Sequence, residues 1–69
     1  MEDLGKKIRK ARKASGMTMG EVAEESGLTI ASVFNAETGK GTPKPSTVKS
    51  IAKAIGVDES TWMEWVRMI

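Results

Sequence analysis

The chain has 69 residues, a length that predicts one small domain over residues 1–69 with a limited hydrophobic core. It contains no cysteine and no histidine, which excludes disulfides, thiolate metal sites and most nucleophile–base pairs of enzymes. We therefore expect no enzymatic activity, no metal and no cofactor.

The net charge is only +2, but basic and acidic residues are segregated along the chain. Residues 1–15 hold six basic and two acidic residues, residues 18–38 hold four acidic and no basic residues, and residues 39–55 hold four lysines and no acidic residue. A polyanion would therefore meet the first and third of these segments. No stretch approaches the length of a membrane span and no apolar run follows the charged N-terminus, so we expect a soluble cytoplasmic protein.

The first expected helix begins near the N-terminus and ends near Gly16. One face of it is formed by four residues at spacings of four, three and four, namely Leu4, Ile8, Ala11 and Ser15. Arg12 lies one turn after Ile8, on or beside this face, where an arginine needs a partner.

Residues 18–38 predict two short helices joined by a glycine-containing turn. Thr18 and Glu21 have the spacing of a capping box, which marks a helix start. Gly27 follows the last apolar residues of this helix, and Thr29 can cap the next one. Two helices connected in this way form a helix-turn-helix unit.

The second helix of this unit has two different faces and is followed by two further helices. Val33, Ala36 and Glu37 point one way, and the opposite, unusually apolar side carries Ile30, Ala31, Phe34 and Asn35. Gly39 can stop the helix, and a loop over residues 40–45 precedes an amphipathic helix formed around Val48, Ile51, Ala52 and Ile55. Residues 58–69 predict a last helix, capped by Asp58, on which one side is shared by Trp62, Trp65, Val66 and Ile69. The expected fold is all-α and compact, with four or five helices.

Together these residues resemble the lambda-repressor and Cro-like helix-turn-helix family, also called the XRE family, over about residues 4–63. The resemblance rests on the order and spacing of several pieces: Ile8-Arg9-Lys10-Ala11-Arg12, Gly16-Met17-Thr18, Glu21-Val22-Ala23, Gly27-Leu28-Thr29, Ser32-Val33, Glu37-Thr38-Gly39, Pro45 and Ile51-Ala52-Lys53-Ala54-Ile55-Gly56-Val57. It implies a sequence-specific transcriptional regulator of the phage or mobile-element repressor type. Such a protein binds operator DNA as a homodimer, inserts its third helix into the major groove, and works at the nucleoid.

The resemblance also assigns roles to individual residues. Contacts to DNA phosphates are expected from Thr18, Met19, Lys40 and Lys44, and contacts to bases from Thr29, Ile30, Ala31, Ser32 and Asn35. Asn35 is the best candidate for a bidentate contact to adenine, and Ile30 or Ala31 could contact thymine methyl groups. In the family the arginine matching Arg12 commonly pairs with the glutamate matching Glu37, in agreement with the partner that Arg12 needs.

Departures from the family pattern leave an alternative open. Family members often carry glutamine at the position of Met19 and polar residues at the positions of Ile30 and Ala31, whereas all three are apolar here. Three interpretations of Ile30 and Phe34 therefore stay open: contact with thymine, partial burial against the loop over residues 40–45, or an interface with another protein, since exposed apolar surface usually marks a partner site. At the last helix, Trp62 is expected to close the core, and a dimer contact is expected at Trp65, Met68 and Ile69.

Overall fold

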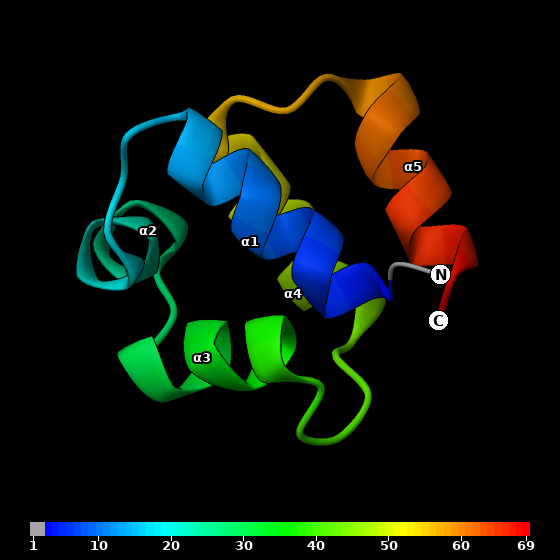
Figure 1. Ribbon diagram of the computed structural model, residues 1–69, viewed down its shortest axis with the longest axis horizontal. Coiled ribbons are helices and arrows are strands. Elements are labelled where there is room, and N and C mark those ends of the chain that lie inside the picture. Colours follow the sequence, from blue (N-terminus) through cyan, green and yellow to red (C-terminus); the bar gives the residue numbers. More distant parts are fainter. Residues whose placement is uncertain (1–2) are drawn as a thin grey trace.

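The computed structural model describes residues 3–69, which form five α-helices and no strand (Figure 1). The helices are α1 (Leu4–Ala14), α2 (Met19–Ser26), α3 (Ile30–Thr38), α4 (Pro45–Ile55) and α5 (Glu59–Arg67). The all-α expectation is therefore confirmed. The first two residues of the expected domain, 1 and 2, lie outside the described part of the chain.

The ends of α2 and α3 follow from local side-chain chemistry. Thr18 accepts a hydrogen bond from the backbone N–H of Glu21, and the Glu21 carboxylate accepts one from the N–H of Thr18, which completes the expected capping box. The Thr29 side chain accepts from the N–H of Ser32 at the start of α3. Gly27 ends α2 with a φ of 73°, a left-handed conformation that suits glycine and turns the chain into α3.

The start of the molecule differs from the expected helical face in two respects. Ser15 is exposed, because α1 ends at Ala14 and Ser15 caps it by donating a side-chain hydrogen bond to the carbonyl of Arg12. Gly5 is buried, and a Cβ placed on it would clash with the backbone carbonyl oxygen of Glu37. Helices α1 and α3 therefore approach each other as closely as a glycine allows.

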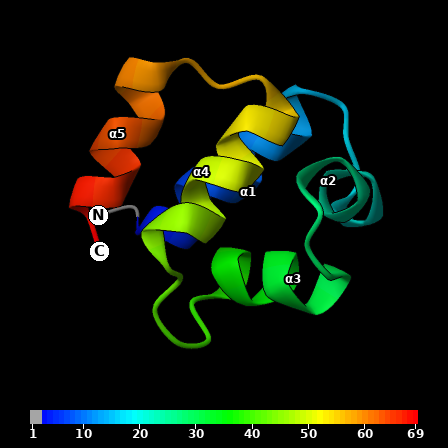
Figure 2. The same cartoon turned by 180° about the vertical axis from the view of Figure 1, so that it is seen from behind.

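The core lies between all five helices. Helices α1 and α4 occupy the centre, α2 and α3 lie on one side of them, and α5 lies on the other side (Figures 1 and 2). The closest packing is between α1 and α3, α2 and α3, α2 and α4, and α4 and α5. The buried apolar side chains are Ile8, Val22, Ala23, Val33, Ala36, Val48, Ile51, Ala52, Ile55 and Trp65.

The expected dimer contact on α5 needs a correction. Trp65 is only 5% exposed and belongs to the core, because α5 packs on α4 and turns this position inward. Trp62 is half-buried against the same core, with the Lys49 ammonium 5.5 Å from the centre of its ring. Met68 and Ile69 remain 44% and 43% exposed, so only these two residues of the expected contact offer apolar surface.

Candidate functional site

The scaffold of the site is an ion pair between the first and third helices. The Arg12 Nε atom lies 2.6 Å from Glu37 Oε2, and Arg12 Nη2 donates to Glu37 Oε1 at 3.1 Å. Both residues are more than nine-tenths buried. Arg12 Nη1 also donates to the carbonyl of Met17 at 2.9 Å, which ties the segment before α2 to the same arginine. One guanidinium thus fixes the orientation of both helices of the helix-turn-helix unit relative to α1.

Helix α3 has an inward and an outward face, as the spacing predicts. Val33, Ala36 and Glu37 are buried, whereas Ile30 is 58% exposed and Phe34 is 42% exposed. Ala31 and Asn35 are exposed on the same outward side. In Figure 1, α3 runs along the lower edge of the molecule, so this outward face is not covered by any other helix of residues 3–69.

The hydroxyl groups at the start of α3 are largely occupied within the helix. Thr29 accepts from the backbone N–H of Ser32, and its hydroxyl group forms a hydrogen bond of 3.0 Å with the Ser32 hydroxyl group. Thr29 therefore caps the helix, and the two hydroxyl groups together keep one proton for a base. Ser32 is half-buried and Asn35 is exposed, so Asn35 and this hydroxyl pair are the polar groups on this helix that can still donate a hydrogen bond.

The start of α2 offers less to an anion than a bare helix N-terminus does. The Glu21 carboxylate already accepts the N–H of Thr18 at 2.9 Å and places a negative charge there. Thr18 accepts from Glu21 but keeps its hydroxyl proton for an outside acceptor. The Met19 side chain packs against the core, so Met19 can contribute only its backbone N–H to a phosphate.

A small polar hollow of about 190 Å³ joins α3 to the loop that follows it. It is lined by Ser32, Asn35, Ala36, Lys40, Thr42, Pro43 and Thr47. The structure thus brings Ser32, Asn35 and Lys40 together at one place. Lys44 is exposed at the N-cap position of α4, outside this lining.

One contact in this region was not anticipated from the sequence. The Lys40 Nζ atom lies 5.9 Å from the centre of the Phe34 ring, within the range of a cation–π interaction. The six-residue separation carries no helical signal, because the chain turns at Gly39 between the two residues. The contact places a positive charge at the edge of the apolar outward face.

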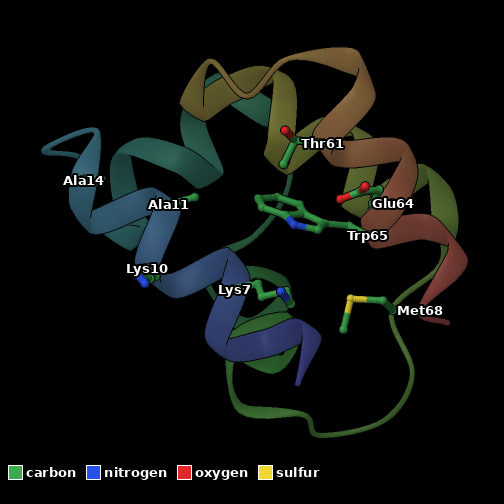
Figure 3. A pocket seen from close by; sticks show the side chains of 8 residues that line it. All are labelled: Lys7, Lys10, Ala11, Ala14, Thr61, Glu64, Trp65 and Met68. Atoms are coloured by element: carbon green, nitrogen blue, oxygen red, sulfur yellow. The ribbon is translucent and has the colours of Figure 1, made fainter. Parts of the chain in front are cut away.

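A larger groove of about 520 Å³ lies between α1 and α5, away from the helix-turn-helix unit (Figure 3). The α1 wall carries Lys7, Lys10, Ala11 and Ala14, and the α5 wall carries Thr61, Glu64, Trp65 and Met68. In Figure 3 the Trp65 ring points from α5 toward α1, and the Met68 side chain lies beside it. A neighbouring hollow of about 330 Å³ joins Met68 and Ile69 to Leu4 and the loop after α3.

Two further properties bear on the class of protein. Within residues 3–69, no three acidic, cysteine or histidine side chains gather in a way that could hold a metal ion. None of the described helices combines the length and the apolar character required to cross a membrane.

Comparison with known proteins gives consistent matches. The family model described as Helix-turn-helix matches residues 8–62. The uncharacterized HTH-type transcriptional regulator RghRB of Bacillus subtilis (strain 168) is 38% identical over 58 residues, which are 83% of this chain and 42% of that protein. The HTH-type transcriptional repressor RghR of the same organism is 36% identical over 58 residues, 83% of this chain and 43% of that protein. The matched stretch is thus less than half of either relative.

Proposed function

The chain belongs to the Helix-turn-helix family, and from this premise we propose that it is a sequence-specific DNA-binding transcriptional regulator of the repressor type. The proposal rests on the difference between the two faces of α3. Its inward face is held by the core and by the Arg12–Glu37 pair, while its outward face is open. A rigidly held helix with a free face can enter a major groove, which is wide enough to admit one helix.

In this proposal the outward face of α3 reads bases. Asn35 and Ser32 supply hydrogen bonds, and the side chains of Ile30 and Ala31 contact the apolar parts of base edges. Thr29 acts as the cap of the reading helix, with its hydroxyl held by Ser32.

Phosphate contacts are assigned to the segments on both sides of α3. Lys40 and Lys44 follow the helix and are exposed, and each would neutralise one phosphate. Thr18 would donate its hydroxyl proton at the start of α2, and Met19 its backbone N–H. Because the negative charge of Glu21 lies beside them, these phosphate contacts at the start of α2 are weaker than those of Lys40 and Lys44.

We further propose that two copies bind one operator, on half-sites about 34 Å apart, and that they act at the nucleoid in the cytoplasm. Met68 and Ile69 supply exposed apolar surface directly after α5, and Met68 lines the groove between α1 and α5 (Figure 3). Sedimentation of the complex tests the stoichiometry: two chains per duplex are expected, and one chain per duplex would contradict the dimer.

One observation favours a second candidate function, a protein-interaction module. The outward face of α3 carries two large exposed apolar side chains, Ile30 and Phe34, and the helix-turn-helix unit carries four acidic residues and no basic one. An apolar protein contact depends little on ionic strength, whereas contacts to several phosphates weaken steeply as salt rises.

The deciding experiment is selection of bound sequences from a random duplex pool, followed by affinity measurements over a range of salt concentrations. The slope of log K against log salt is negative, and we expect Lys40→Ala and Lys44→Ala each to reduce its magnitude by about one. Lys53→Ala is the matched control, because Lys53 lies beside Glu25 and Ser26 near the C-terminal end of α4. Absence of binding to any duplex at low salt would refute the DNA function and leave the protein module.

A further inference from the structure

We infer, on the premise that α3 enters the major groove as proposed above, that Ile30 and Phe34 read the C5-methyl group of thymine. These methyl groups would then select the bound sequence at positions that the Asn35 amide does not read. The ligand is duplex DNA with thymines at fixed positions in each half-site.

The reading face of α3 has few hydrogen-bonding groups. The Thr29 hydroxyl is used twice within α3, and Ser32 is half-buried beside it. Asn35 is the one exposed amide on the outward face of α3, and Ser32 adds a single hydroxyl group. A single bidentate amide distinguishes one base pair, which is too little to define an operator.

The same face offers apolar surface. Ile30 is 58% exposed, the highest value among the large exposed apolar side chains of residues 3–69, and Phe34 is 42% exposed. Gly20 of α2 lies close to this surface, since a Cβ at Gly20 would be 3.8 Å from Ile30 Cδ1. Ile30 is thus flanked by a residue without a side chain. In the major groove the apolar group on a base edge is the thymine methyl, so it is the feature that these side chains complement.

The spacing of Ile30 and Phe34 along α3 corresponds to about two base-pair steps. Ile30 and Phe34 are four residues apart on one helix face, a separation of about 6 Å along the helix axis. Successive base pairs rise by about 3.4 Å, so the two side chains span about two base-pair steps. Two methyl-sensitive positions about two steps apart are therefore expected in each half-site.

A positive charge lies at the edge of this surface. The Lys40 ammonium lies 5.9 Å from the centre of the Phe34 ring. An apolar face with a cation at its edge complements the major groove, where methyl groups lie between two rows of phosphates. A purely apolar protein surface would leave this cation without an anionic partner.

The test replaces thymine by deoxyuridine, one position at a time, in the duplex selected from the random pool. Deoxyuridine lacks only the methyl group and keeps the base pair and its acceptor oxygen. Loss of one buried methyl is expected to weaken binding about fourfold, and two losses about fifteenfold. Fluorescence anisotropy of the labelled duplex with the full chain measures these changes.

Protein variants then assign each methyl to a side chain. Ile30→Ala should abolish the uracil effect at one position, and Phe34→Ala should abolish it at the other. Met63→Ala is the matched control, because Met63 is 42% exposed on α5 and should leave both effects intact. All three residues are exposed, so the variants should fold, which circular dichroism checks.

The outcomes separate the inference from the function on which it depends. Equal binding of thymine and uracil duplexes at every position would overturn methyl reading and leave DNA binding in place. Uracil effects that persist in both Ile30→Ala and Phe34→Ala would also overturn it. Failure to bind any duplex would overturn the proposed function together with the inference, and would leave the apolar face to a protein partner.

Discussion

Removing the Glu37 carboxylate should destabilise the domain strongly. In Glu37→Ala the Arg12 guanidinium loses its partners at 2.6 and 3.1 Å while the residue itself stays more than nine-tenths buried. Loss of one partner of a buried pair typically costs about 3–5 kcal/mol, because the remaining charge is left uncompensated. The hydrogen bond from Arg12 to the carbonyl of Met17 remains and supports the lower part of this range.

This cost is large relative to the whole stability of the domain. At about 0.05–0.15 kcal/mol per residue, a chain of 69 residues has a free energy of unfolding of about 3.5–10 kcal/mol. Urea denaturation followed by circular dichroism should therefore show a much lower midpoint for Glu37→Ala, or a chain already unfolded without urea. Glu24→Ala is the matched control: this carboxylate is exposed on α2, so its loss should change stability by less than about 0.5 kcal/mol.

A double variant distinguishes two possible causes of this loss of stability: the unpaired charge of Arg12 and the loss of side-chain packing. Arg12→Met combined with Glu37→Leu removes both charges and keeps apolar volume, so its stability should be close to that of the original chain or higher. A loss below about 1 kcal/mol for Glu37→Ala would refute the reasoning. A double variant as unstable as the single one would show that the cost lies in packing and not in an unpaired charge.

Three other changes test different parts of the structure. Gly5→Ala should cost about 1–3 kcal/mol in urea denaturation, because its Cβ would clash with an α3 carbonyl, whereas Gly20→Ala, with no atom nearer than 3.8 Å, should gain about 0.5 kcal/mol. Asn35→Ala should cost about 1–3 kcal/mol of binding and relax the selected sequence at one position; equal weakening for all duplexes would show a positioning role. The hydroxyl of Ser60 holds the pKa of Asp58 below its ordinary value of 3.8. The stability from Asp58 is thus present above that value and lost as the pH falls through the lowered pKa, and Asp58→Asn should flatten this acid limb of the stability curve.

The boundaries of α2 and the start of α3 could be predicted because they depend on neighbouring residues. Thr18 and Glu21 satisfy each other's backbone groups within one turn, and Gly27 meets a conformational requirement of its own position. The inward face of α3 was also predictable, because the spacing of Val33 and Ala36 records which side of a helix is buried.

Features that depend on contacts between distant helices could not be predicted in the same way. The last helix has two tryptophans on one side, and no local signal says that Trp65 fills the core while Met68 stays exposed. The burial of Gly5 follows from the position of the Glu37 carbonyl, which is far away in the sequence. At the candidate site, the use of the Thr29 hydroxyl by Ser32 follows from the cap geometry, and this geometry changes which residues can donate to a base.

The separation of the two faces of α3 also affects how such a protein can evolve. Side chains on the outward face, such as Ile30, Ala31 and Asn35, are exposed, so most substitutions there should change stability by less than about 0.5 kcal/mol. Variants with altered target preference would then remain folded and available to selection. Mutations at Val33 or Glu37 would instead be removed through loss of the fold, whatever their effect on binding. Target preference and stability can therefore diverge at different rates within one nine-residue helix.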